Sequence, residues 1–246
     1  MYNQIENKVV AITGAGSGIG KAIALKLSNL NARLILGGRR MESLEKVEDE
    51  IKSEGGEAIC IKTDVRHKAD LENLVNAAVR KYGRLDVIIN NAGVAQVSRI
   101  DELDIDGWEE MIDINFKGVL YGMAAAIPVF RQQQSGHIVN IISTAGIKIV
   151  PTQGVYAATK NAVRTITEAF RQESDGTMRI TGISPGMVKT AFANNMKNAA
   201  TRSAISQTME QLAIEPDAVA DAVLYAISQP ADVEVGDIVI RPARQN

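Results

Sequence analysis

Three residues near the middle of the chain have types and a spacing that could carry out proton transfer: Ser143, Tyr156 and Lys160. Small and apolar residues surround Tyr156 and indicate a helix, so the four-residue spacing places the phenol and the ammonium on one helix face. An unperturbed tyrosine has a pKa of about 10, too high for a proton carrier at neutral pH. An ammonium roughly 4 Å away would lower that pKa by up to ~2–3 units. The pair therefore predicts a general acid and base, unless the lysine is only a solvated residue of an amphipathic helix.

A glycine loop, Gly14 to Gly20, is the second stretch with chemical meaning. It follows a β-branched run at 8–13 and precedes a stretch whose apolar residues lie on one helical stripe. Strand, glycine loop and helix in this order are typical of a dinucleotide site, because glycines let the backbone approach a pyrophosphate and the helix N-terminus offers free N–H groups. The loop reads T-G-x-x-x-G-x-G from Thr13 rather than the common G-x-G-x-x-G. The alternative is a glycine-rich turn without a ligand.

The residues after the next expected strand, at 33–36, predict which dinucleotide binds. Where an acid would accept from the 2′-hydroxyl group of NAD, the chain has Gly38, and Arg39 and Arg40 follow. Arginines at this place accommodate the 2′-phosphate of NADP. We therefore expect NADP(H) to be preferred over NAD(H), although a pair of solvated arginines is also common on protein surfaces.

Composition excludes several classes of function. The chain has 246 residues, a formal net charge of −2 and a pI of about 5.8, so no basic field favours nucleic acid or an anionic membrane. The single cysteine, Cys60, excludes an internal disulfide. The polar N-terminus has no signal-peptide pattern, and the longest apolar stretch, at 119–130, is too short to span a bilayer. We expect a soluble cytoplasmic protein, and we assign no metal ligands.

Strand-like runs alternate with helical patterns along the whole chain. This alternation predicts an α/β fold: a single-domain, Rossmann-type doubly wound parallel sheet of about seven strands, with helices on both faces, over residues 1–246. Residues 188–210 have a loose pattern of small and polar side chains, and we expect them to form a mobile flap over the substrate. The expected strands are at 8–13, 33–36, 57–61, 87–89, 137–142, 178–184 and 237–240.

Two expected helices, at 108–130 and 154–173, are apolar on more sides than one sheet face can cover. This pattern predicts that they pair with helices of a second subunit. Asn115 lies inside the first of them, where an asparagine by itself indicates little.

Taken together, these motifs resemble those of the short-chain dehydrogenase/reductase family, in its compact single-domain branch. The resemblance extends from residue 7 to residue 240, and the motifs occur in the family's order and spacing. They are TGAGSGIG at 13–20, DV at 64–65, NNAG at 90–93, Asn115, Ser143, YAATK at 156–160, and SPG at 184–186 with Thr190.

The resemblance implies catalytic roles for four residues. Tyr156 would be the general acid and base, and Ser143 would hydrogen-bond the substrate oxygen as charge develops there. Lys160 would hold the nicotinamide ribose and, with the cationic oxidised nicotinamide, lower the pKa of Tyr156. Asn115 would use its backbone to hold a water in a proton relay. The cofactor would carry the hydride chemistry, while the protein orients it.

The resemblance also implies a set of cofactor contacts and a homotetramer, a dimer of dimers with two-fold axes. Many NADP-using members have a basic residue inside the glycine loop, and this chain has Ser17 there, so the 2′-phosphate would rest mainly on Arg39 and Arg40. The expected cofactor-binding residues are Gly14, Ser17, Gly18, Ile19, Gly20, Arg39, Arg40, Asp64, Val65, Asn91, Ala92, Gly93, Tyr156, Lys160, Pro185, Gly186, Val188 and Thr190.

The C-terminal end narrows the substrate class. It reads GDIVIRPARQN where many ketoacyl reductases have a glycine-rich V-x-G-G tail, and it resembles the group of NADP-dependent 3-hydroxy-acid and serine dehydrogenases. We expect hydride transfer between the nicotinamide and a small to medium secondary alcohol or its ketone or aldehyde, with 3-hydroxy acids the first candidates. The alternatives are a ketoacyl reductase of fatty-acid or polyketide type and a non-catalytic NADP-binding regulator, although regulators typically lose the tyrosine or the lysine.

The expected walls of the substrate site are residues 94–99, residues 145–153 and the flap after Gly186. Lys148 and Lys189 are candidate partners for a substrate carboxylate, or else solvated surface charges. The other wall residues are Gln96, Ile147, Val150, Gln153, Met187 and Phe192.

Overall fold

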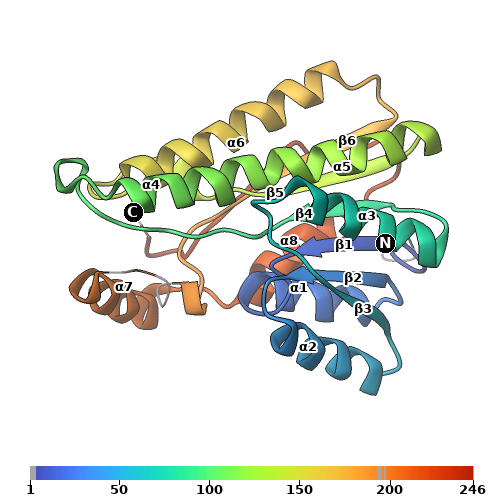
Figure 1. The fold of residues 1–246 in the computed structure, drawn as a ribbon, viewed down its shortest axis with the longest axis horizontal. Coiled ribbons are helices and arrows are strands. Elements are labelled where there is room, and N and C mark those ends of the chain that lie inside the picture. Colours follow the sequence, from blue (N-terminus) through green and yellow to red (C-terminus); the bar gives the residue numbers. More distant parts are fainter. Residues whose placement is uncertain (1–3, 193–195, 197, 246) are drawn as a thin grey trace.

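The expected strands form one parallel sheet, as seen in a computed structural model that describes residues 4–192, 196 and 198–245. Within these residues the sheet has seven strands in the order β3-β2-β1-β4-β5-β6-β7, drawn as arrows in Figure 1. This arrangement confirms the predicted α/β fold. The strands are β1 (Val9–Thr13), β2 (Arg33–Gly38), β3 (Glu57–Lys62), β4 (Val87–Asn90), β5 (Gly136–Ile141), β6 (Met178–Pro185) and β7 (Asp237–Ile240).

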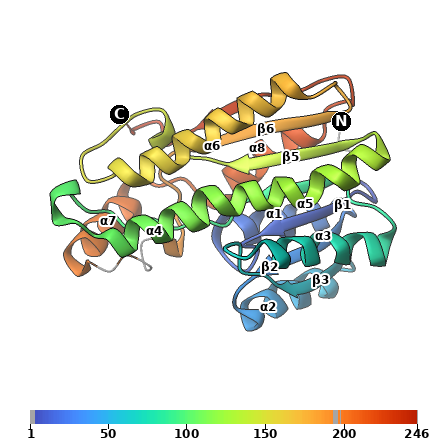
Figure 2. The same ribbon diagram turned by 45° about the horizontal axis from the view of Figure 1, so that its top comes forward.

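Helices cover both faces of the sheet, as Figures 1 and 2 show. One face carries α1 (Gly18–Ser28), α2 (Met41–Ser53) and α8 (Pro216–Ile227). The other face carries α3 (Lys68–Tyr82), α5 (Gly118–Gln133) and α6 (Gly154–Glu173), with α4 (Ile105–Met111) leading into α5. Two short 3₁₀ turns lie in the loops before α4 and α6: η2 (Ile100–Glu102) and η4 (Thr144–Gly146).

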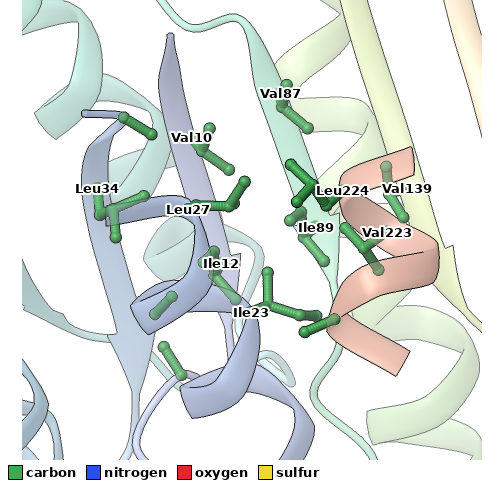
Figure 3. Close-up of a cluster of buried hydrophobic side chains, with 14 of the residues drawn as sticks. Val10, Ile12, Ile23, Leu27, Leu34, Val87, Ile89, Val139, Val223 and Leu224 are labelled. Carbon is green, nitrogen blue, oxygen red and sulfur yellow. The ribbon is translucent and has the colours of Figure 1, made fainter. Parts of the chain in front are cut away.

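The strands read as continuous apolar runs because both of their faces are buried. Along β1, Val10 and Ile12 pack with α1 and α8 in one core cluster, part of which is drawn in Figure 3. Val9 and Ala11 point the opposite way, into the cluster under α3 and α5. The period of two therefore divides the core into two layers, with the sheet between them.

The single helix expected at 108–130 is instead a helical run with a π-helical segment in its middle. α4 passes through a six-residue π-helix, Ile112–Lys117, before α5 begins. Gly118 N–H bonds to Asp113 O, five residues back, which is the π pattern. Asn115 lies in this segment and is fully buried. Apolar periodicity does not distinguish a π turn from an α turn, so the sequence did not predict it.

The region expected to be a flap, 188–210, contains a helix that the sequence pattern did not predict. α7 (Ala199–Leu212) is capped at its N-terminus by Asn198, whose side chain accepts a hydrogen bond from Thr201 N at 3.0 Å. Val188 forms an isolated parallel bridge with Ile214, so both ends of the region lie side by side. Asn194 and Asn195 of the predicted flap lie outside the described residues, and its mobility stays a prediction.

Within residues 4–192 and 198–245, no helix is long and apolar enough to cross a bilayer.

His137 on β5 is a buried titratable group whose environment fixes its neutral form. The Thr181 hydroxyl donates to Val235 O at 2.7 Å, so His137 Nε2–H donates to Thr181 Oγ1 at 2.8 Å. His137 Nδ1 is then an acceptor that has no partner among the described residues. Burial, with the charges of Arg179 and Lys8, lowers the pKa of His137 to about 3.

We expect this histidine to make the fold less stable in mild acid. Its pKa is 6.5 when unperturbed and about 3 in the folded chain, so the unfolded state binds more protons between these values. Stability is therefore lost as the pH falls below about 6.5. Urea unfolding at pH 7 and pH 5 measures the effect. Between pH 7 and pH 5, the free energy of unfolding of His137→Gln should fall by about 2 kcal/mol less than that of the wild type. Equal losses would contradict the assignment.

Candidate active site

A cavity of about 950 Å³ opens at the carboxyl ends of the strands. β1 pairs with β2 on one side and with β4 on the other, so the chain changes direction across the sheet at this point. Crevices at such switch points bind ligands in open parallel sheets, because the loops on either side diverge. The segments that follow β1, β2, β4, β5 and β6 all contribute to the cavity wall.

The glycine loop between β1 and α1 forms one wall of this cavity. Gly14 and Gly18 have φ values of +68° and +53°, which side chains rarely adopt. Asn91, after β4, donates its side-chain N–H to Thr13 O at 2.9 Å and to Gly14 O at 3.2 Å, and so fixes the loop. A Cβ on Gly20 would lie 2.3 Å from Gly14 O. Gly20, predicted as a cofactor contact, lies beneath the loop and not on the cavity wall.

The same wall has the features that a dinucleotide needs. The open side of the loop has no side-chain bulk at Gly14, Gly16 or Gly18, all of which line the cavity. α1 begins at Gly18, and the Ser17 side chain does not cap it, so the first N–H groups of the helix remain available to a pyrophosphate. The loop therefore fits a nucleotide cofactor.

Two arginines after β2 form a cationic edge of the cavity. Arg39 and Arg40 are exposed, and their side chains have no hydrogen bond or ion pair with any described residue. Asp64, which follows β3, is the carboxylate nearest to them in the wall, and its charge is already neutralised. Hydrogen bonds from Arg66 hold the pKa of Asp64 at about 2. This edge is thus free to bind an anion.

Ser143, Tyr156 and Lys160 meet at the carboxyl end of β5. Lys160 Nζ donates to Ile141 O at 3.0 Å and is 4% exposed. Its ammonium lies 6.0 Å from the centre of the Tyr156 ring. Ser143 Oγ accepts from Ala145 N at 3.1 Å and also hydrogen-bonds to Tyr156. The tertiary structure therefore brings together the three residues that the sequence spacing singled out.

The predicted lowering of the Tyr156 pKa by Lys160 alone is wrong. Burial raises the pKa of Tyr156 to about 12, and the hydrogen bond from Ser143 opposes this rise only in part. Burial also lowers the pKa of Lys160 to about 8. The sequence argument counted the attraction between the ammonium and a phenolate and left out desolvation, which disfavours both charged forms.

Asn115, the fourth predicted catalytic residue, does not line the cavity. Its side-chain carbonyl accepts from Val94 N at 2.8 Å, and its amide donates to Val94 O at 2.8 Å and to Thr159 Oγ1 at 3.2 Å. Asn115 thus clamps the loop after β4 to α6. Val94, which it holds, is part of the cavity wall.

The remaining predicted site residues converge on the one cavity. Its wall includes Gly14, Ser17, Gly18, Ile19, Arg39, Arg40, Asp64, Val65, Asn91, Ala92, Gly93, Ser143, Tyr156, Lys160, Pro185, Gly186, Val188 and Thr190.

An apolar chamber surrounds the exposed side of Tyr156. Phe192 lies with its ring centre 6.0 Å from that of Tyr156. Met209, on α7, belongs to the same small cluster and also lines the cavity. The helix missed in the sequence therefore supplies part of the substrate wall. The chamber's apolar residues are Ala95, Val97, Met187, Phe192, Met196, Ile205 and Met209.

The two candidate lysines occupy different places. Lys148 lines the cavity, together with Ile147, Val150 and Gln153. Lys189 is not part of its wall and forms an ion pair with Glu215 at 3.1 Å. Gln96 is buried and donates to Glu110 at 3.1 Å. Of the two lysines, only Lys148 can reach a substrate in the cavity.

Arg241 and Gln245 are among the cavity residues that were not found from the sequence. They lie after β7, beyond the last motif, and no local pattern assigns a tail residue to a cavity formed 50 or more residues earlier. Only the pairing of β7 with β6 brings the tail there.

Comparisons with known proteins agree with this geometry. The family model described as short chain dehydrogenase matches residues 8–201. An uncharacterized oxidoreductase of Listeria monocytogenes is 46% identical over 244 residues, which cover 98% of this chain and 98% of that protein.

Two solved structures have a similar fold over nearly the whole chain. A closed form of serine dehydrogenase complexed with NADP+ has a TM-score of 0.89 and 31% identity, covering 97% of this chain and 96% of that one. A short chain dehydrogenase/reductase from Burkholderia phymatum in complex with NAD has a TM-score of 0.87 and 27% identity, covering 96% of this chain and 89% of that one.

Proposed function

This chain belongs to the short-chain dehydrogenase family, and on that premise we propose that it is an NADP-dependent oxidoreductase of a secondary alcohol and its carbonyl compound. One observation carries the proposal: a single cavity contains both the glycine loop and the Ser143, Tyr156 and Lys160 cluster. β2 and β5, whose ends carry Arg39 and Ser143, are three strand positions apart in the sheet, or roughly 14 Å. An extended dinucleotide can bridge such a distance.

The chain's own groups account for proton transfer and substrate orientation. Tyr156 Oη accepts the hydroxyl proton of the alcohol in oxidation and returns it in reduction. Ser143 Oγ accepts from Ala145 N–H and hydrogen-bonds to Tyr156, so a substrate oxygen held at Tyr156 Oη lies beside the serine hydroxyl, which can turn to donate its hydrogen to that oxygen. The nicotinamide, when bound, supplies the hydride chemistry, accepting the hydrogen and the electron pair that leave the alcohol carbon.

Lys160 is suited to hold the cofactor and to assist the tyrosine. An ammonium has three N–H donors, and the bond to Ile141 O uses one of them, which leaves others for ribose hydroxyls. Because burial by itself raises the pKa of Tyr156, the phenolate needs a further positive charge close by. The oxidised nicotinamide would provide that charge, so we propose that Tyr156 becomes a working base only in the cofactor complex.

The cofactor preference is proposed from the unpaired arginines after β2. We expect NADPH to bind at least about tenfold more tightly than NADH, because Arg39 and Arg40 can form charge-assisted bonds to a 2′-phosphate. Arg39→Ala should reduce this ratio by weakening NADPH binding while NADH binding stays unchanged. Arg131→Ala, an exposed arginine outside the cavity, is the matched control. Fluorescence titration measures the affinity of each of the three proteins for each cofactor. Equal binding of both cofactors by the wild type would overturn the assignment.

We propose 3-hydroxy acids as the first substrates to test. The chamber around Tyr156 is lined by apolar side chains, and Lys148 on the wall of the same cavity could attract a carboxylate. A solved structure with a similar fold is named a serine dehydrogenase, and serine is itself a 3-hydroxy acid. NADPH formation from a panel of 3-hydroxy acids, their methyl esters and apolar alcohols tests the proposal. Preferred turnover of the esters or apolar alcohols would reject 3-hydroxy acids as substrates, and no turnover with any compound of the panel would reject the oxidoreductase proposal.

The homotetramer is proposed from the surface of the α4–α5 run and from the family. Ile112 and Leu120 are 40% and 36% exposed on this run. α5 and α6 run side by side over one face of the sheet in Figures 1 and 2. Apolar side chains at these positions support burial against a second subunit.

A further inference from the structure

The C-terminal turn is attached to the active-site end of the sheet by specific contacts. Gly186 N–H donates to Ile240 O at 2.7 Å, which continues the β6–β7 pairing past the last strand residue. The Gln245 side chain accepts from Met187 N at 2.8 Å, and its amide lies 3.5 Å from Thr144 Oγ1. The turn is therefore tied to segments that flank the chamber, and Figures 1 and 2 show the C-terminus near the start of α6.

Arg241 occupies the base of this turn, against Gly186. A Cβ on Gly186 would lie 2.7 Å from Arg241 Cβ, so the glycine is what lets the tail approach. Arg241 follows β7, and Ser143 follows β5, two strand spacings away, or roughly 10 Å. A guanidinium on a long side chain can therefore reach a substrate held at Ser143.

The described residues of the cavity wall include more cationic than anionic side chains. Asp64 is the only carboxylate among the described wall residues, and Arg66 already neutralises it. The Arg241 side chain has no hydrogen bond or ion pair with any described residue. Unpaired cations that line a cavity attract an anionic ligand. The cationic wall residues are Arg39, Arg40, Lys148, Lys160 and Arg241.

We propose that Arg241 binds the carboxylate of the substrate and thereby determines the preference for 3-hydroxy acids, an inference that rests on the proposed oxidoreductase function. The planar guanidinium can form two parallel hydrogen bonds to a carboxylate, which fixes the orientation of the acid as well as its charge. Gln245 is a positioning residue, because its bonds to Met187 and Thr144 hold the turn that carries Arg241.

Lys148 is the weaker candidate for this contact. Lys148 and Arg241 are both exposed, but the Lys148 ammonium offers a point charge without a fixed direction, whereas a guanidinium can bind a carboxylate through two parallel bonds. The backbone around Arg241 is held by hydrogen bonds before and after it, because Ile240 O accepts from Gly186 N–H and Pro242 O accepts from Gln245 N–H. A side chain whose backbone is already ordered loses less conformational entropy on binding, so more of the interaction energy appears as affinity.

Kinetics with a charged and a neutral substrate test the proposal. We expect Arg241→Ala to lower kcat/KM for 3-hydroxybutanoate at least about tenfold, mainly through KM. The same variant should change kcat/KM for methyl 3-hydroxybutanoate by less than about twofold. Arg241→Lys should lie between, since it keeps the charge and loses the second hydrogen bond. Arg244→Ala, an exposed arginine of the same turn that is not on the cavity wall, should match the wild type.

A binding measurement separates this proposal from the proposed function. Calorimetry of the NADP+-saturated protein with 3-methylbutanoate, which has a methyl group in place of the hydroxyl and cannot be oxidised, needs no turnover. We expect binding in the wild type and Arg244→Ala, at least about tenfold weaker binding in Arg241→Ala, and no such difference with 3-methylbutanamide. The NADPH affinity of Arg241→Ala should be unchanged, which excludes a cofactor contact.

Each outcome has a distinct meaning. Arg241-dependent binding of 3-methylbutanoate without turnover of any alcohol would support the carboxylate site and reject the oxidoreductase. Turnover of the ester but not of the acid would overturn the Arg241 proposal and leave the oxidoreductase standing. Equal losses for acid and ester in Arg241→Ala would also overturn it, because the residue would then be only structural.

Discussion

Tyr156→Phe is expected to lose turnover by about 10²–10⁴-fold while the fold and the NADPH affinity survive. The substitution removes only the hydroxyl that takes up the substrate proton. The ring remains and keeps its contact with Phe192, 6.0 Å between centres. Steady-state rates, NADPH titration and the melting temperature together measure the three properties.

The matched control for this variant is Tyr225→Phe. Tyr225 is 50% exposed on α8 and lies outside the cavity wall, so loss of its hydroxyl should leave turnover unchanged. A Tyr156→Phe protein that kept most of its activity would show that another group transfers the proton. A loss of NADPH binding equal to the loss of turnover would assign Tyr156 to cofactor binding instead.

Lys160→Met should reduce both turnover and cofactor affinity. Methionine keeps most of the side-chain volume and removes the ammonium, and with it the donors proposed for the ribose and the charge beside Tyr156. We expect kcat to fall about 100-fold or more and NADPH to bind about tenfold more weakly. Lys148→Met, at the exposed rim of the same cavity, should change neither NADPH affinity nor turnover of a neutral alcohol that much.

The stability of Lys160→Met distinguishes a functional role from a structural one. Burial lowers the pKa of Lys160 from 10.5 to about 8, so the charged form opposes folding. That cost is fully present below about pH 8 and decreases as the pH rises toward 10.5, where the folded state has released the proton first. Removing the charge should therefore leave the melting temperature at pH 7 unchanged or higher. A strongly destabilised variant would instead indicate that the bond to Ile141 O is mainly structural.

Local patterns in the sequence were sufficient for the sheet, the glycine loop and most of the cavity wall. β-branched runs identify buried parallel strands because both faces of such strands need apolar side chains, as Val10 and Val9 of β1 do. Gly14 and Gly18 were recognisable as part of a glycine motif between a strand and a helix, and their positive φ angles are ones that favour glycine. Ser143, Tyr156 and Lys160 were found because a strand end and a helical spacing of four fix where such side chains point.

Features that depend on contacts between distant segments were decided only by the tertiary structure. Asn115 lies in the π-helical segment and hydrogen-bonds to the backbone of Val94, and the apolar pattern of the sequence does not indicate that contact. The pKa of Tyr156 depends on how much protein surrounds it, and burial outweighs the charge that the sequence placed nearby. Lys189 and Lys148 look alike along the chain, and only the ion pair with Glu215 separates them.

Arg241 is the clearest case of this division. The sequence determines that it is an arginine after a strand-like run. Its place on the cavity wall comes from the pairing of β7 with β6, from the space left by Gly186 and from the Gln245 contacts. Each of these joins residues about 50 or more positions apart, where chain-local propensities have no influence, so long-range pairing and packing determine which charges face the substrate.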